Sequence, residues 1–328
     1  MLYPLKFHPL FKEKIWGGEK IKTVLKKNFS PLSNCGESWE ISGVEGNISI
    51  VKEGPLNGRD LKSLIDEYKD ELVGRHVYRK YNNQFPLLIK FIDANDDLSI
   101  QVHPDDEQAF KRHRSFGKTE MWYTMQADQG AKLINGFNRP VTREMYLEYF
   151  NQGRLVELLN QEEVEEGNIY FIPAGRVHTI GKGLLIAEIQ QTSDVTYRIY
   201  DFERRDNDGK TRELHIEEAL EVIDYQFYDD YKVSYKEKIN DAVQVVSCDY
   251  FKTNKLVVEG RIERTYQGLD SFVILINVQG EGSIISNDRK TSVSIGEVIL
   301  IPSSLNSIFI ESDKGLRLLE IYVNGLIK

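Results

Sequence analysis

The chain has 328 residues, of which 41% are hydrophobic, so it is long enough for two ordinary domains with buried cores. Its formal net charge of −9 argues against a nucleic-acid partner, and its two cysteines, Cys35 and Cys248, are too few for a disulfide framework. No run of about eighteen apolar residues and no secretory signal is present, so we expect a soluble cytoplasmic protein without a membrane partner.

The first clear element is a helix. Residues 1–58 are rich in turn signals and short apolar stretches, which predict short strands. In DLKSLIDEYKDELVG the apolar residues then follow helical spacing, with Asp60 as a plausible N-cap and Gly74 as a plausible stop. The pattern predicts a helix over residues 60–74.

From Phe85 onward, short apolar or alternating runs are separated by turn residues, which is typical of a β-sandwich or β-barrel. We expect strands in PLLIKFID, LSIQVH, EMWYTM, AKLING, NIYFIP and LLIAEIQ. Helices are expected in HPDDEQAFKRH, over residues 142–160 and in LHIEEALEVID, and short strands return from about residue 241.

The pattern also contains an internal repeat. GNIYFIPAGRVHTI and GEVILIPSSLNSIF share a glycine, alternating apolar residues and Ile-Pro. In this alignment His178 lies opposite Ser307, and Glu120 lies opposite Ser271. Polar residues of the metal-ligand type therefore occur in the first copy only. We predict a mainly β protein with two related barrels, of which one carries a site and the other only packs.

The predicted domains are residues 1–240 and residues 241–328. The first is a metal-bearing barrel with N-terminal strands and helical insertions at 60–74 and 142–160. The second is a degenerate barrel without ligands.

Four residues are candidate metal ligands: Gln101, His103, Glu120 and His178. Gln101 and His103 are two apart in a predicted strand, so their side chains point to the same face. Two imidazoles, one carboxylate and one amide oxygen suit a divalent ion such as zinc, with room for water or substrate. The absence of cysteine from the set favours a catalytic site over a structural one.

Plain structural roles compete with this interpretation. His103 could precede a helix that begins at Pro104, and His178 could be a turn residue. The four residues taken together, absent from the second copy, favour the metal site. We expect His113 to be a surface residue, and no ligand-spaced partner accompanies His8, His76 or His215.

Several segments together resemble the type I mannose-6-phosphate isomerases in their short bacterial form. They run in order from about Phe11 to about His215 and are FKEKIWGG, NCGESWEIS, PLLIKFIDANDDLSIQVHPDD, GKTEMWY, IPAGRVHTI and DVTYRIYDF. LSIQVHPDD is the most specific of these segments. The C-terminal third is similar to the family in architecture more than in motif.

The resemblance implies a pair of cupin-type, or jelly-roll, β-barrels, one zinc per chain and interconversion of mannose 6-phosphate and fructose 6-phosphate. The family's metal ligands match Gln101, His103, Glu120 and His178. Its active-site arginine matches Arg198, and its cleft lysine and glutamate match Lys118 and Glu188.

The chemistry gives these three cleft residues roles. Moving a proton between C1 and C2 through an enediol needs a base and something to stabilise an oxyanion. Arg198 suits a phosphate or an oxyanion, whereas Lys118 and Glu188 are candidates for proton transfer. Alternatively, Arg198 could pair with Asp194 or Asp201, Lys118 could be a solvated loop residue, and Glu188 could be a buried partner of Arg198.

Two other functions compete with the isomerase. A non-catalytic cupin that binds a sugar phosphate would not need Lys118, Glu188 and Arg198 together. An iron-dependent oxygenase also uses two histidines and a carboxylate, but Gln101 and the cationic cleft residues fit it poorly. Ser99 and Lys90, which flank the ligand strand, are weaker candidates for contact with a substrate phosphate. The oligomeric state stays open.

Overall fold

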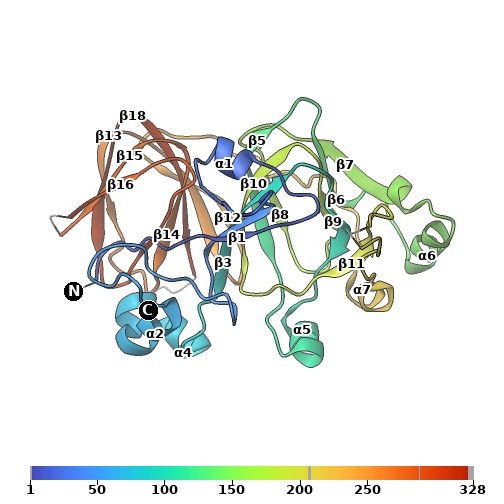
Figure 1. The fold of residues 1–328 in the computed structure, drawn as a ribbon, viewed down its shortest axis with the longest axis horizontal. Coiled ribbons are helices and arrows are strands. Elements are labelled where there is room, and N and C mark those ends of the chain that lie inside the picture. The colour runs from blue at the N-terminus through green and yellow to red at the C-terminus, as the bar shows by residue number, and fades with distance from the viewer. Residues whose placement is uncertain (1, 206–207, 288, 324–328) are drawn as a thin grey trace. The chain divides into compact units, whose positions relative to one another are not determined.

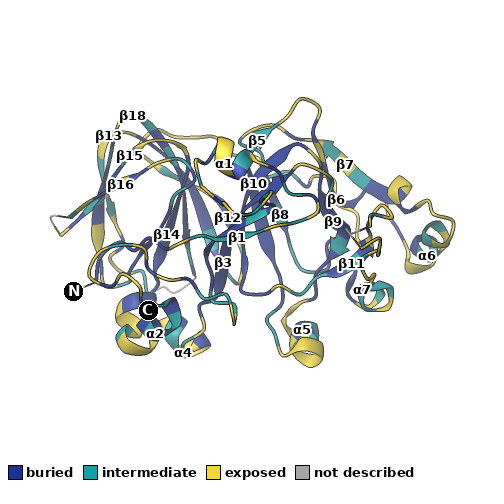
Figure 2. Ribbon diagram, viewed as in Figure 1, coloured by how far each residue is buried: buried dark blue, intermediate teal, exposed yellow. Residues whose placement is uncertain are grey.

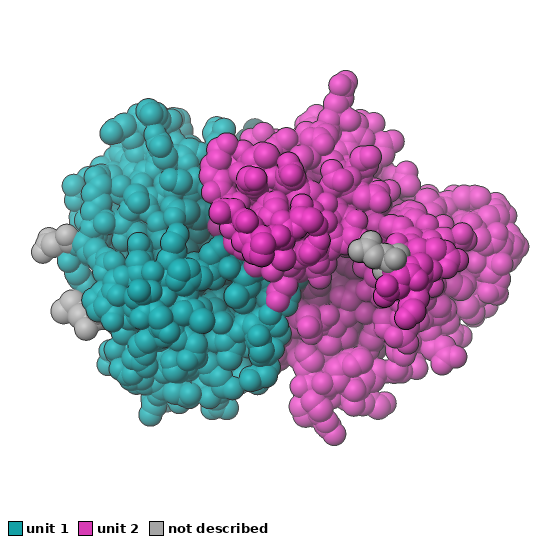
Figure 3. All heavy atoms as spheres, viewed as in Figure 1, with its two compact units in different colours: residues 1–10, 39–90, 234–328 teal, residues 11–38, 91–233 magenta. Residues whose placement is uncertain are grey.

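The computed structural model describes residues 2–205, 208–287 and 289–323, and the chain divides into two compact units (Figure 3). Unit 1 comprises residues 1–10, 39–90 and 234–328, and unit 2 comprises residues 11–38 and 91–233. Residues 39–90, with the helices near 60–74, thus belong with the C-terminal strands, although the sequence predicts them in the metal-bearing domain. The contiguous boundary after residue 240 stays a prediction.

The described strands form three sheets (Figure 1), which confirms the mainly β prediction. The segments in which the sequence predicts strands between residues 86 and 191 are all strands in the structure. No helix in the described residues is long and apolar enough to cross a membrane.

One sheet has seven strands and contains the C-terminal barrel of unit 1. Its path is β12 (Ala242–Ser247), β13 (Lys252–Thr265), β18 (Ser307–Tyr322), β14 (Val273–Gly280) and β17 (Val298–Ile301), with β15 (Gly282–Ser286) between β18 and β16 (Arg289–Val293). Alternate residues of these strands are apolar and buried, among them Leu256, Leu275, Ile299 and Leu318, and they form one core cluster.

Unit 1 also contains α2 (Leu61–Tyr68), α3 (Asp70–Val73) and α4 (Arg75–Tyr81). Asp60 caps α2 as predicted, because its side chain accepts from the Ser63 N–H at 2.8 Å. The predicted single helix over 60–74 is nevertheless broken. Lys69 has φ 45°, which ends α2, and α3 stops at Gly74.

Two further sheets contain the strands of unit 2. The first has the order β1 (Leu10–Lys12), β2 (Glu37–Ile41), β3 (Leu87–Ala94), β10 (Leu184–Gln191), β5 (Glu120–Ala127) and β8 (Ile169–Ile172). The second has the order β11 (Tyr197–Tyr200), β4 (Ile100–Val102), β9 (His178–Ile180), β6 (Lys132–Phe137) and β7 (Leu159–Glu163). The strands at the centre of both sheets are largely buried (Figure 2).

Helices cover the outer face of the second sheet. Ile100 and Val102 of β4 belong to a core cluster with residues of α6 (Arg143–Asn151) and α7 (Ile216–Val222). Because side chains alternate along a strand, Gln101 between them faces the barrel interior. The predicted helix over 142–160 is shorter than expected: α6 ends at Asn151, a 3₁₀ turn follows at Leu155–Leu158, and β7 begins at Leu159.

The remaining helices are α1 (Lys20–Thr23) and α5 (Asp106–His113). The α5 helix is the one predicted in HPDDEQAFKRH. Its N-cap is Asp105, which accepts from the Gln108 N–H at 2.9 Å, so Pro104 lies outside the helix rather than at its first position.

The strand ladders support the internal repeat but shift one match. Ile172 of β8 pairs with Glu120, and its counterpart Ile301 of β17 pairs with Val273. Glu120 therefore corresponds to Val273, not to Ser271 as the sequence alignment suggests. Val273 is apolar and buried, so the second barrel still lacks this carboxylate.

The same register shows that both barrels have a glutamate at one equivalent position. Glu188 lies opposite Trp122 in unit 2, and Glu320 lies opposite Leu275, the counterpart of Trp122, in unit 1. Glu320 is 1% exposed and accepts hydrogen bonds from Arg264 at 2.9 and 3.1 Å, from Tyr266 at 3.1 Å and from Asn254 at 2.8 Å. In the second barrel the charge is thus fully occupied by protein partners.

Replacing Arg264 by Met should destabilise the protein by about 3 kcal/mol, because it leaves the buried Glu320 carboxylate without its cation. Urea unfolding of the whole chain measures the change. Arg261→Met is the matched control, since Arg261 is an exposed arginine of the same strand that lies over the Phe309 ring. Equal midpoints for the two variants would contradict the argument.

Candidate active site

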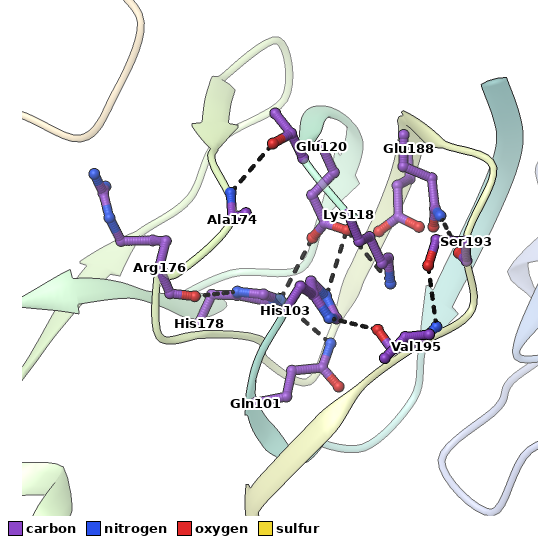
Figure 4. A network of polar contacts seen from close by, with 12 residues as sticks. Gln101, His103, Lys118, Glu120, Ala174, Arg176, His178, Glu188, Ser193 and Val195 are labelled. Atoms are coloured by element: carbon purple, nitrogen blue, oxygen red, sulfur yellow. Dashed lines mark hydrogen bonds and ion pairs between the residues drawn. The ribbon is translucent and has the colours of Figure 1, made fainter. Parts of the chain in front are cut away.

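Two imidazoles and a carboxylate converge inside the barrel of unit 2 (Figure 4). Glu120 is the first residue of β5, His178 is the first residue of β9, and His103 follows the last residue of β4. Their ligand atoms lie within 4.8 Å of one another, and the three side chains are at most 1% exposed. His103 Nε2 is 3.6 Å from Glu120 Oε2, and His178 Nε2 is 3.4 Å from Glu120 Oε1.

Backbone carbonyls fix both imidazoles. His103 Nδ1 is 3.1 Å from the Val195 carbonyl oxygen, and His178 Nδ1 is 2.8 Å from the Arg176 carbonyl oxygen. A carbonyl only accepts, so each Nδ1 carries the proton and each Nε2 turns a lone pair toward Glu120. Burial also lowers the pKa of His178 to about 3, which keeps this imidazole neutral at ordinary pH.

The spacing fits a tetrahedral metal. Two ligands that are each about 2.1 Å from a zinc ion lie about 3.4 Å apart at the tetrahedral angle. The two imidazoles lie 3.4 and 3.6 Å from different oxygens of Glu120, Oε1 and Oε2, and each separation is close to this edge length. A hydrogen-bonding pair of these atoms would come closer, to about 2.8 Å. The donor set and its geometry therefore fit a divalent cation such as zinc.

Gln101 lies beside this group. In the ladders it is directly opposite His178, and its Nε2 is 3.3 Å from His178 Nε2. To offer an oxygen to a metal, the Gln101 amide must turn over so that Oε1 takes the place now held by Nε2. Ser99 Oγ, which is 3.5 Å from the present Oε1, could then accept from the amide N–H.

Two charged residues lie next to the group. Lys118 is 5% exposed, and its Nζ is 3.5 Å from Glu120 Oε2, so it is not a solvated loop residue. Glu188 is 3% exposed and accepts from the Trp122 indole at 3.0 Å. Glu188 and Glu120 lie on neighbouring strands at positions two residues apart in register, which puts both side chains on the interior face.

Arg198, Gln101 and His178 lie directly opposite one another on three neighbouring strands and form a row, with Arg198 at its edge. Arg198 is directly opposite Gln101 in the ladder of β11 and β4, so the two side chains share the interior face. Its Nη1 donates to the Glu213 carbonyl at 2.7 Å, and its buried Nε has no hydrogen-bond partner among the described residues. Burial lowers the pKa of this guanidinium, which still stays protonated at neutral pH. Asp201, one of the two aspartates considered as alternative partners, is instead bound by Arg204 and Arg212.

The two predicted phosphate contacts differ in their surroundings. Ser99 is 3% exposed and points at Gln101, as described above. Lys90 belongs to unit 1, where its Nζ lies 5.4 Å from the centre of the Trp39 ring. Their role in phosphate binding stays a prediction.

Known proteins resemble the chain over nearly its whole length. Residues 4–133 match the family described as phosphomannose isomerase type I, catalytic domain, and residues 241–322 match the mannose-6-phosphate isomerase cupin domain. Mannose-6-phosphate isomerase ManA of Bacillus subtilis is 35% identical over 94% of this chain and 96% of its own. The chain belongs to the type I phosphomannose isomerase family.

Solved structures of phosphomannose isomerases share the fold. The crystal structure of the mannose 6-phosphate isomerase from Bacillus subtilis has a TM-score of 0.86 and 31% identity, with 98% of this chain and 99% of that chain covered. A mannose 6-phosphate isomerase bound with zinc and yttrium has a TM-score of 0.80, with 98% of this chain and 100% of that chain covered, but at 15% identity it shows the fold alone. The predicted cupin architecture is confirmed.

The sequence did not single out every residue that touches the phosphomannose isomerase site. Trp122 is fully buried, binds Glu188 and packs edge-on against the His178 ring at 5.3 Å between centres. Its position two residues after Glu120 on the same strand is a usable signal, because such residues share a face. Arg176, two residues before His178, was also missed.

Proposed function

We propose that this protein interconverts mannose 6-phosphate and fructose 6-phosphate by proton transfer through an enediol. The observation that carries the proposal is the buried group of His103, Glu120 and His178 with Lys118 and Glu188 beside it, in a member of the phosphomannose isomerase family. The Bacillus subtilis relative ManA, whose match covers 94% of this chain, is named a mannose-6-phosphate isomerase.

One zinc ion per chain would be held by His103 Nε2, His178 Nε2, Glu120 and, after the amide turn, Gln101 Oε1. When bound, zinc supplies a Lewis acid that polarises the carbonyl of the substrate. The fit rests on the neutral imidazoles and on the separations of 3.4 and 3.6 Å between these imidazoles and the carboxylate oxygens of Glu120.

The protein's own residues would move the proton and hold the substrate. Lys118 and Glu188 are the two candidates that carry the proton between C1 and C2, since both are buried beside the ligand group. Arg198 would hold the phosphate or stabilise an oxyanion, because its guanidinium is charged and its buried Nε can still donate. Ser99 and Lys90 are secondary candidates for the phosphate.

We further propose that a small sugar phosphate is the partner of the protein and that it works in the cytoplasm. The thiols of Cys35 and Cys248 donate to backbone carbonyls at 3.3 and 3.4 Å, as reduced cysteines do. Residues 241–328 would act as the degenerate second barrel, whose carboxylate Glu320 is occupied by Arg264.

A coupled assay tests the function. Purified protein is given mannose 6-phosphate, and formation of fructose 6-phosphate is followed before chelation, after chelation and after return of zinc. We expect turnover that disappears with the chelator and comes back with zinc. A protein with a full complement of metal and no turnover would contradict the isomerase and would favour the sugar-phosphate-binding alternative.

A further inference from the structure

Arg176 is a buried cation with an aromatic environment. The residue is 6% exposed, and its guanidinium carbon lies 4.4 Å from the centre of the Tyr228 ring and 4.7 Å from that of Tyr231. In the described part of the chain no carboxylate forms an ion pair with it. A buried charge is costly unless something compensates it, and two ring faces supply part of that compensation. Such an arrangement in the core calls for a reason.

The turn that carries Arg176 is connected to both histidines of the metal group. The Gly175 N–H donates to the His103 carbonyl at 2.9 Å, and the Arg176 carbonyl accepts from His178 Nδ1 at 2.8 Å. Gly175 has φ +87°, and a Cβ there would lie 2.9 Å from the Val222 carbonyl oxygen, so the turn has little room for another shape. A shift of this turn would therefore move the acceptor that orients the His178 imidazole and would disturb the backbone at His103.

The arginine side chain fastens this turn to the barrel. It extends away from the ligand group (Figure 4), and its Nη1 is 3.4 Å from Asn135 Oδ1. Asn135 is directly opposite His178 in the ladder of β6 and β9. Tyr231 is itself fixed to β6, because its hydroxyl donates to the Phe137 carbonyl at 2.9 Å and accepts from the Phe137 N–H at 3.2 Å.

We infer that Arg176 is a positioning residue for the metal centre: packed against Tyr228 and Tyr231, it holds the turn that orients the His178 imidazole and supports the backbone of His103. The inference rests on the proposed zinc centre. Partners that orient ligating histidines commonly change metal affinity by about 10- to 100-fold. Arg176 acts through the position of its own backbone carbonyl, and it does not touch the metal or the substrate.

The test is the affinity for zinc, measured without any turnover. The full chain is stripped of metal and titrated with zinc against a chromophoric chelator, as wild type and as Arg176→Met, Arg176→Lys and Arg154→Met. Arg154→Met is the matched control, because Arg154 also lies over a ring, that of Tyr149 at 4.7 Å, but is exposed and contacts no ligand. Thermal unfolding of each metal-free protein reports general loss of stability.

We expect Arg176→Met to weaken zinc binding by about 10- to 100-fold. Arg176→Lys should lose less affinity because it keeps a cation against the two rings, and Arg154→Met should match the wild type. If Arg176→Met does not fold, Tyr228→Leu removes the more exposed of the two rings that contact Arg176, and it should also bind zinc more weakly than the wild type. The inference would be overturned if Arg176→Met bound zinc with wild-type affinity. If Arg176→Met failed to fold, wild-type affinity in Tyr228→Leu would overturn it instead. Neither result would affect the proposed function. A wild-type chain that binds no zinc would overturn the metal centre itself.

Discussion

Glu120→Ala is expected to lose bound zinc and isomerase activity together. Among the residues that the structure describes, Glu120 is the one carboxylate that forms a metal-capable group with both imidazoles, at 3.6 Å from His103 Nε2 and 3.4 Å from His178 Nε2. Without it the remaining proposed ligands, His103, His178 and Gln101, are all neutral, and the neighbouring Lys118 repels a divalent ion. Loss of the metal's contribution of several kcal/mol should reduce kcat by at least about 10³-fold.

Metal analysis and the coupled assay on the same preparations check this prediction. Glu120→Gln separates charge from shape, since the amide fills the same space but carries no charge, and it should also lose most of its zinc. Glu163→Ala is the control, because Glu163 is an exposed carboxylate of β7 in the same unit. A Glu120→Ala protein that retains a full complement of zinc would remove Glu120 from the ligand set.

The alternation of side chains made much of the fold and of the ligand group predictable. In IQVH, the apolar residues at 100 and 102 pack under α6 and α7, and this leaves Gln101 on the interior face. A period of two along a strand is a local property, so the sequence displays it directly. The repeat is visible for the same reason, since both copies have the same alternation of apolar residues before an Ile-Pro turn.

What the sequence could not supply are features that depend on contacts between distant segments. The match of Glu120 with Ser271 was off by two residues, because short strands align about equally well in registers of the same parity, and only the pairing with β8 and β17 decides between them. The breaks in the predicted helices depend on single residues with positive φ, such as Lys69. The contacts of Arg176 with Tyr228 and Tyr231 join a turn to tyrosines about 50 residues later in the chain, for which no sequence period exists.

Arg198→Ala is expected to lose turnover and keep zinc. Arg198 faces the interior opposite Gln101. Among the described residues, its side chain has a hydrogen bond only to the backbone carbonyl of Glu213, so the metal donors do not depend on it. Removing a fixed donor that stabilises charge in a transition state typically lowers kcat by about 10²- to 10³-fold. A residue that held only the phosphate of the ground state would instead raise KM at nearly constant kcat.

Steady-state kinetics and zinc content therefore distinguish the two roles of Arg198. Arg198→Lys keeps the positive charge without the fork of donors. If Arg198 contacts the phosphate, this variant should have a KM closer to the wild-type value than Arg198→Ala has. If Arg198 contacts an oxyanion, the geometry matters and the lysine should restore little of kcat. Arg139→Ala, at an exposed arginine of the same unit, controls for the loss of a surface charge. Wild-type kinetics in Arg198→Ala would remove the residue from the site, whereas loss of zinc would mean that the row of Arg198, Gln101 and His178 acts as one structural unit.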